Sequence, residues 1–193
     1  MKLRFLVASL ALGLLTTTAH AQTGLYLNPI AMHVSLSQAD NGPYAFLGQN
    51  NTSAMFYGIS LGGYYDFHSA SKMKFGFDVR DAIVHSNNAA LDNVLFGLRI
   101  SGQPFSRPFR PYVQPALGFG RSTSPSSSLH KSNVEFTLNA GVDYPIRKHI
   151  DWRIVEAGYS SVGVINSSNF GYPTTISAAT VISVSTGLVF RFH

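Results

Sequence analysis

Apolar and polar residues alternate along most of this chain, and the clearest case is residues 181–192. One phase of this segment is apolar and ends in two aromatic residues, whereas the other is small and carries one charge. A period of two over this length predicts a β-strand, because successive side chains of a strand point to opposite faces. The two phases are Ile182, Val184, Thr186, Leu188, Phe190 and Phe192, against Val181, Ser183, Ser185, Gly187, Val189 and Arg191.

The same alternation occurs eight times, and no segment after residue 21 has a helical period. We therefore predict an all-β domain. The eight segments are residues 25–36, 55–67, 75–80, 94–101, 113–120, 134–144, 152–159 and 181–192.

Two segments change phase. The apolar set shifts near Asn28-Pro29, so that Ile30 and Val34 fall out of phase with Leu25, and it shifts again after Ile154. A slip of one residue inside a strand predicts a β-bulge in each segment. Proline cannot donate to the strand ladder, so Pro115 predicts a further irregularity.

The connections between the segments alternate in length. Residues 68–73, 103–110 and 145–150 are short, whereas residues 38–53, 85–92, 121–132 and 162–178 are mostly longer and rich in Asn, Ser, Gly and Pro. This order places both chain ends at the short turns, as in single-chain outer-membrane barrels with short periplasmic turns. It predicts an eight-stranded antiparallel up-and-down transmembrane β-barrel.

The composition of the weaker phase favours a membrane barrel over a soluble periplasmic ligand-binding barrel. A soluble barrel would expose Lys, Glu and Thr, whereas this phase is mostly Gly, Ser, Ala and Asn. Its isolated charges would each cost several kcal/mol against lipid, roughly 2–4 for Arg at the midplane, but can pair inside a lumen. The predicted lumen charges are Asp66, Asp78, Arg80, Arg99, Glu135, Asp143, Arg153, Glu156 and Arg191.

Aromatic residues of the apolar phase gather near the short-turn ends of the segments. This position predicts a girdle at the periplasmic membrane interface. Its members are Phe67, Phe75, Tyr144, Trp152, Phe190 and Phe192.

Residues 1–21 are predicted to be a secretory signal, which leaves residues 22–193 as one barrel domain. Lys2 and Arg4 precede a short apolar core, and Ala19-His20-Ala21 is a small-x-small cleavage site. The chain has no Cys, so disulfides, thiolate metal sites and a lipidated Cys are excluded. Only 12 % of the residues are charged, and the sequence has no run of basic residues of the kind that binds nucleic acid.

Three stretches resemble a known family: GVDYPIRKHIDWRIVEAGY (141–159), STGLVFRF (185–192) and PYVQPALGFG (111–120). They resemble small outer-membrane β-barrel proteins common in acidobacteria and, more broadly, the OmpA-like and opacity-protein superfamily. The resemblance implies a monomer in contact with outer-membrane lipids. It also implies delivery by the barrel-assembly machinery, which reads a C-terminal strand ending in Phe. This chain departs by one residue, because His193 follows Phe192.

Two pairs have the spacing of the His and Ser in barrel-type lipid A deacylases, namely His33 with Ser35 and His130 with Ser132. Neither Ser is followed by the Asn of the deacylase signature, and the late strand around residues 158–161 has no His. We therefore predict that the protein is not an enzyme. The remaining His residues have no metal-ligand spacing, and no acidic cluster resembles a calcium site, so we predict no metal or cofactor.

These observations predict an outer-membrane β-barrel with a structural or surface-interaction role and a mostly plugged polar lumen. The alternatives are a minor pore, a lipid A-modifying barrel enzyme and a soluble periplasmic ligand-binding barrel. Loop aromatics are expected to pack on the barrel rim or to bind a partner: Tyr44, Phe46, Phe170 and Tyr172, with Leu47 and Phe56 nearby. The short turns are basic at Lys72, Arg107, Arg110, Arg147 and Lys148, although lipopolysaccharide would favour cations at the other end.

Overall fold

The computed structural model describes residues 22–39, 41, 45–70, 72–86, 89–102, 108–123, 130–162 and 178–192. The predicted signal at residues 1–21 lies outside the described residues, as do Tyr44, Arg107, Phe170 and Tyr172. No helix in the described part of the chain is long and apolar enough to cross a membrane.

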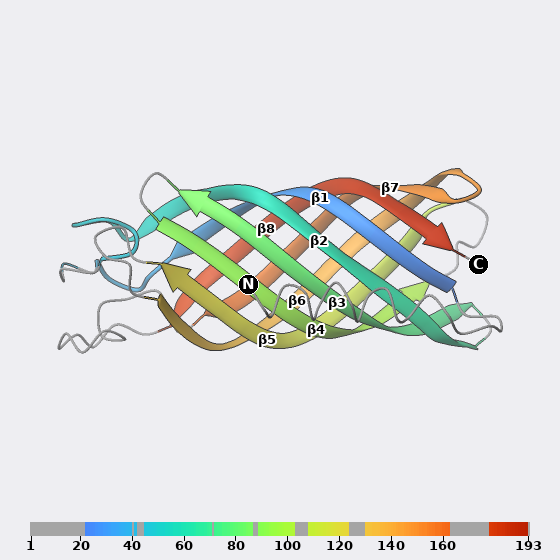
Figure 1. Ribbon diagram of the computed structural model, residues 1–193, viewed down its shortest axis with the longest axis horizontal. Coiled ribbons are helices and arrows are strands. Elements are labelled where there is room, and N and C mark those ends of the chain that lie inside the picture. Colours follow the sequence, from blue (N-terminus) through green and yellow to red (C-terminus); the bar gives the residue numbers. More distant parts are fainter. Residues whose placement is uncertain are drawn as a thin grey trace.

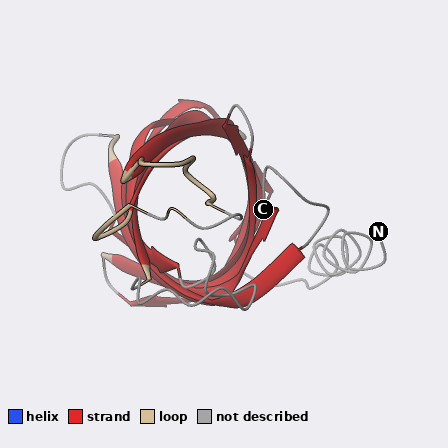
Figure 2. Ribbon diagram, turned by 90° about the vertical axis from the view of Figure 1, so that its left-hand side faces the viewer, coloured by secondary structure: helices blue, strands red, loops and turns tan. Residues whose placement is uncertain are grey.

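Eight antiparallel strands close into one barrel, which confirms the predicted fold class (Figures 1 and 2). Each strand pairs with the next in the chain, and β1 pairs with β8 to close the ring. The strands are β1 (Gln22–Ser35), β2 (Ser53–Ala70), β3 (Met73–Ser86), β4 (Ala89–Gly102), β5 (Arg110–Thr123), β6 (His130–Arg147), β7 (Ile150–Val162) and β8 (Ala179–Phe192).

The start of β1 and the end of β8 lie at the same end of the barrel, here named the terminal end (Figure 1). The β2–β3, β4–β5 and β6–β7 turns share this end, and the opposite end is named the loop end. The prediction of a long connection at residues 85–92 is wrong. β3 continues to Ser86 and β4 begins at Ala89, so only two residues separate these strands.

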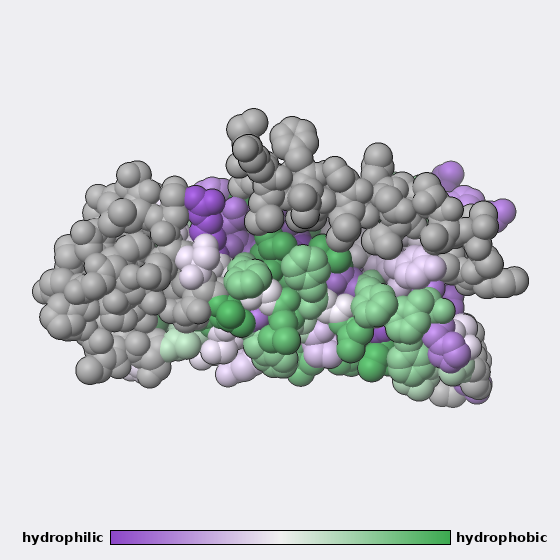
Figure 3. Space-filling view, turned by 60° about the horizontal axis from the view of Figure 1, so that its bottom comes forward, coloured by the Kyte–Doolittle hydropathy of each residue, from purple (hydrophilic) through white to green (hydrophobic). Residues whose placement is uncertain are grey.

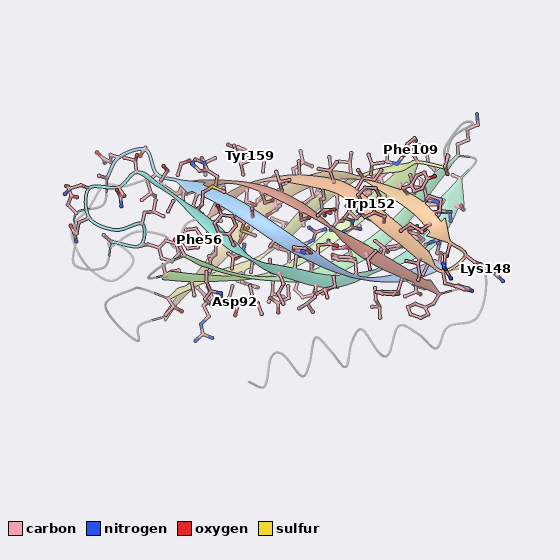
Figure 4. The ribbon with its side chains drawn as sticks, turned by 90° about the horizontal axis from the view of Figure 1, so that it is seen from above. Phe56, Asp92, Phe109, Lys148, Trp152 and Tyr159 are labelled. Atoms are coloured by element: carbon pink, nitrogen blue, oxygen red, sulfur yellow. The ribbon has the colours of Figure 1, made fainter. Side chains whose placement is uncertain are left out.

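The outer surface of the barrel is apolar (Figure 3). Alternate residues are exposed there, as from Ile182 to Phe192 on β8, and a tilted strand needs about 9–11 residues to cross a bilayer. The predicted aromatic girdle lies at the terminal end: Phe67, Trp152, Phe190 and Phe192 are exposed, and Phe75 and Tyr144 are partly exposed. Trp152 points outward near this end in Figure 4.

The predicted bulge in β7 is confirmed, because the register with β8 shifts between Arg153 and Glu156. The predicted bulge in β1 is wrong: the register of β1 with β2 is continuous. Ile30 and Val34 face the lumen in the same phase as Asn28, because the loop half of the lumen is apolar. The register is also unshifted at Pro115, although the pairing of β4 with β5 is interrupted beside it.

Candidate functional site

The lumen contains the largest concentration of chemically reactive side chains. All nine charged residues that the alternation assigned to the lumen are buried. Asp151 is buried there as well, although sequence analysis placed it beside a turn and did not assign it to the lumen. Its position at the start of β7, one residue before the outward Trp152, is the signal that could have identified it.

One ion pair crosses the lumen from β3 to β7. Arg80 donates from Nη1 to Oε1 of Glu156 at 2.7 Å and from Nη2 to Oε2 at 3.0 Å. Tyr112 on β5 donates its hydroxyl to Oε2 of the same carboxylate at 2.5 Å. A bidentate arginine–carboxylate pair fixes both partners in orientation as well as in distance. Glu156 therefore ties three strands together inside the barrel.

A second centre forms around Asp143 on β6. Its Oδ2 accepts from Nη2 of Arg99 at 2.9 Å, and its Oδ1 accepts from Nε of Arg153 at 2.9 Å. Arg153 also lies 3.4 Å from Oε2 of Glu156, which connects the two centres. Because buried charges must be paired to remain in a dry interior, this connected network accounts for their tolerance there.

Tyrosine rings fill the space around the arginines. The guanidinium of Arg99 lies 3.7 Å from the ring centroid of Tyr112 and 4.4 Å from that of Tyr64. Each lumen tyrosine in turn lies over a glycine of the neighbouring strand, so that a Cβ at the glycine would overlap the ring. The three cross-strand pairs are Tyr64 over Gly24, Tyr26 over Gly62, and Tyr112 over Gly141.

The loop half of the lumen holds an apolar cluster instead of charges. Phe46, from the connection between β1 and β2, stacks on Phe56 of β2 with ring centroids 5.2 Å apart. Sequence analysis expected Phe46 and Leu47 on the rim or free to bind a partner, whereas both are buried in this cluster. The other buried members are Ile30, Met32, Val34, Leu36, Ala82, Val84, Ala89, Leu91, Val162, Ala179 and Val181.

Glu135 on β6 differs from the other buried glutamate. Its Oε1 accepts from Nδ2 of Asn93 at 2.9 Å and from the Thr137 hydroxyl at 3.2 Å. Among the side chains that the structure describes, no Lys or Arg lies within ion-pair distance of it, and its Oε2 has no hydrogen-bond partner. Its neighbours are thus neutral donors.

A cavity of about 400 Å³ opens in the terminal end of the lumen. Arg110 donates to Oδ2 of Asp151 at 2.9 Å on one side of it, and Lys74 donates to Oε1 of Gln22 at 2.6 Å on another. Charges of both signs line this cavity, and Arg99 and Asp143 form part of its inner wall. The cavity therefore ends at the ion-pair network.

The structure does not assemble the candidate deacylase groups. His33 faces outward and is exposed, and the Ser35 hydroxyl donates to the backbone oxygen of Thr180 at 3.4 Å. The side chain of His130, the partner predicted for Ser132, lies outside the described side chains. Across the described residues, no group of three or more His, Asp or Glu side chains is placed to hold a metal ion.

A closed eight-stranded barrel with an apolar outer face and a charged lumen defines the class of outer-membrane β-barrel proteins. Over residues 5–190 the chain matches the family model described as "Outer membrane protein beta-barrel domain", and it belongs to that family. The protein is accordingly an outer-membrane β-barrel protein. The narrower resemblance to acidobacterial barrels stays a prediction.

Two solved structures show the same fold. Neisserial surface protein A is similar with a TM-score of 0.56 and 16 % identity, over 87 % of this chain and 97 % of that one. Ail, the attachment invasion locus protein of Yersinia pestis, is similar with a TM-score of 0.50 and 12 % identity, over 90 % of this chain and 100 % of that one. The comparison with curated proteins finds no match.

Proposed function

We propose that this protein is a non-enzymatic, non-conducting outer-membrane barrel with a structural or surface-interaction role. The observation that carries the proposal is the filling of the lumen in two successive layers. The Arg80–Glu156 and Arg99–Asp143 network occupies the middle, and the apolar cluster with Phe46 occupies the loop half. An ion would have to break buried ion pairs and then cross an apolar layer, so the resting barrel is closed.

The direction of insertion is part of the same proposal. The terminal end faces the periplasm, as the short turns at this end support. Phe190 and Phe192 project outward from β8, in agreement with recognition of this strand by the barrel-assembly machinery. The closed ring has no free strand edge through which copies could pair, which supports a monomer among outer-membrane lipids.

Planar-bilayer recording tests closure directly. The refolded full chain is compared with an open porin as the positive control. It is also compared with the double variant Arg80→Ala, Glu156→Ala, in which both the cation and the carboxylate of the cross-lumen pair are removed. We expect no discrete conductance steps from the wild-type protein. Steps from the wild-type protein whose size changes in the double variant would instead support the minor pore.

Overexpression tests the enzymatic alternative separately. Lipid A from cells expressing the wild-type chain is compared by mass spectrometry with lipid A from cells expressing Ser35→Ala. We expect the same acyl pattern in both, because the Ser35 hydroxyl donates to the backbone oxygen of Thr180 and His33 is not bonded to a described acid. A loss of acyl chains that disappears in Ser35→Ala would contradict the proposal.

A further inference from the structure

The cavity at the terminal end of the lumen is lined by polar atoms that have no hydrogen-bond partner among the described residues. The donors are Nε and Nη1 of Arg99 and Nε2 of Gln22, and the acceptors are Oδ1 of Asp66 and Oδ1 of Asp151. All of these side chains are at least nine-tenths buried. Because buried polar groups are nearly always hydrogen bonded, such a set around one cavity indicates a polar occupant.

The two donor groups are held in place by their neighbours. Arg99 donates from Nη2 to Asp143 at 2.9 Å, and its guanidinium packs 3.7 Å from the ring centroid of Tyr112. Gln22 accepts from Nζ of Lys74 at 2.6 Å through Oε1, so its Nε2 remains available as a donor. Donors that are ordered before binding spare the ligand part of the entropic cost of association.

The two acceptors differ in how their charge is balanced. Asp151 forms ion pairs with Arg110 and Arg191 through its Oδ2. Asp66, in contrast, forms no ion pair with another described side chain, and Lys74 of the neighbouring strand bonds to Gln22 instead. A cationic group of a ligand would therefore gain most beside Asp66.

The charges of the lining match in number, and both signs have unpartnered atoms. A simple anion would lie near the unpartnered oxygen of Asp66, and a simple cation would meet the unpartnered donors of Arg99. A molecule that carries one cation and one anion satisfies both groups and leaves the net charge of the lumen unchanged, which a low-dielectric interior favours. The lining charges are Asp66, Asp143 and Asp151 against Lys74, Arg99 and Arg110.

We propose that the terminal-end cavity binds a small zwitterion, a molecule with an ammonium group and a carboxylate, such as a dipeptide with free termini. The carboxylate accepts from Arg99 and Gln22, and the ammonium group donates to Asp66, with Oδ1 of Asp151 as a further acceptor. The cavity volume of about 400 Å³ is in the range of small-ligand sites. The proposal holds whether or not the lumen conducts and whichever way the barrel inserts.

Matched peptides test which charges the site requires. The refolded full chain, in micelles of a non-ionic detergent, is titrated with alanyl-alanine, its N-acetyl derivative, its C-terminal amide and the doubly blocked peptide. At about pH 6.5, where a free amino terminus is protonated, these peptides carry both charges, the anion alone, the cation alone and neither. Amide chemical shifts measured by NMR report both the affinity and the place of binding.

With alanyl-alanine, the amide shifts of Asp66, Arg99 and Ser101 should move together and reach saturation, whereas that of Leu91 in the apolar cluster should not move. Ser101 is a buried residue of the cavity lining. Each blocked peptide should bind at least about tenfold more weakly than alanyl-alanine, because it lacks one or both charge-assisted hydrogen bonds.

A matched pair of variants identifies the acid responsible. Asp66→Asn keeps the shape of the side chain, and alanyl-alanine should lose about tenfold in affinity and bind no more tightly than its N-acetyl derivative. Glu135→Gln is the control, because Glu135 is also a buried acid without an ion-pair partner among the described side chains, but is not part of the cavity lining. It should leave all four affinities unchanged. A gel shift on boiling checks that both variants are folded, and the peptides on the wild-type protein keep the test available if Asp66→Asn does not fold.

Three results would overturn the proposal. The first is an absence of amide shifts in the cavity with alanyl-alanine, which would leave the unpartnered atoms to water alone. The second is a blocked peptide that binds the wild-type protein as tightly as alanyl-alanine; for the N-acetyl derivative this would define an anion site. The third is a loss of affinity in Glu135→Gln equal to that in Asp66→Asn.

Discussion

Arg80 and Glu156 join opposite walls of the barrel: three strands lie between β3 and β7 in either direction around the ring, and the two side chains meet through two hydrogen bonds of 2.7 and 3.0 Å. The pair therefore acts as a crosslink through the lumen. Glu156 is also held by Tyr112 and Arg153. Removing this carboxylate would take the bidentate acceptor from Arg80, which would keep only Asp78 at 3.5 Å as an ion-pair partner, and would leave Arg153 with Asp143 alone.

Glu156→Gln should lower the free energy of unfolding by about 3–5 kcal/mol, the cost of breaking a buried pair on one side. The matched substitution Glu135→Gln should change it by less than about 1 kcal/mol or raise it, because Glu135 is bonded only to neutral donors in the described structure. Urea unfolding in detergent micelles, followed by Trp152 emission, measures both variants. Equal losses would show that the two carboxylates have the same environment.

Gly141→Ala should destabilise the barrel by about 1–3 kcal/mol, as overpacking does. A Cβ at this position would meet the hydroxyl and ring of Tyr112, which is itself hydrogen bonded to Glu156. Gly102→Ala is the control, because its Cβ would meet Pro111 at 3.4 Å, an ordinary contact. The same unfolding assay compares them, and an equally stable Gly141→Ala variant would contradict the tyrosine-over-glycine packing.

Phe46→Ala should loosen the connection between β1 and β2. The ring is buried against Phe56, and a Phe→Ala change in a core costs about 3–5 kcal/mol. Local opening of the connection should therefore become at least about tenfold more frequent, since about 1.4 kcal/mol corresponds to a factor of ten. Limited proteolysis of the folded barrel measures this rate, with the outward-facing Met55→Ala as control. A rate equal to that of the wild-type protein would place Phe46 outside the cluster.

The folded protein should be heat-modifiable in the outer-membrane fraction of expressing cells. An unboiled barrel stays compact in detergent and runs faster on a gel than the boiled chain, because its closed ladder has no edge at which unfolding begins. A single band at the position of the unfolded chain, with the protein recovered from the periplasm, would be inconsistent with a membrane barrel.

The period-two alternation was sufficient to predict the strands and the nine lumen charges, because a charged residue in an otherwise apolar strand has only the lumen available to it. The alternation gave a wrong prediction of a bulge in β1. In this strand the inward face changes from polar to apolar toward the loop end, and the outward face changes from apolar to polar. Beyond the lipid band the outward His33 is polar, and the inward Ile30 and Val34 are apolar because they contact the buried Phe46 cluster. A pattern of apolar positions identifies a buried or lipid-facing side, but does not distinguish between the two.

The contacts inside the lumen could not be predicted from the sequence for a different reason. Tyr64 lies over Gly24 only because the two are register partners, and the register depends on the turns and on the closure of the whole ring. The crosslink between Arg80 and Glu156 likewise joins residues 76 positions apart, through a geometry that alternation does not contain. Alternation determines which side of the sheet a residue occupies, whereas closure determines its partner.

Spin labelling along β8 tests the central claim most directly, and a chain without cysteine allows it without background substitutions. Single cysteines at residues 182–185 and 188–190 are labelled in reconstituted vesicles, and their collisions with oxygen and with a water-soluble nickel chelate are measured. The account predicts high oxygen accessibility at Ile182, Val184, Leu188 and Phe190, and low accessibility to both reagents at Ser183, Ser185 and Val189. Access of the nickel chelate to these three inward positions would show a water-filled lumen, and the opposite alternation would show that the apolar face is inside.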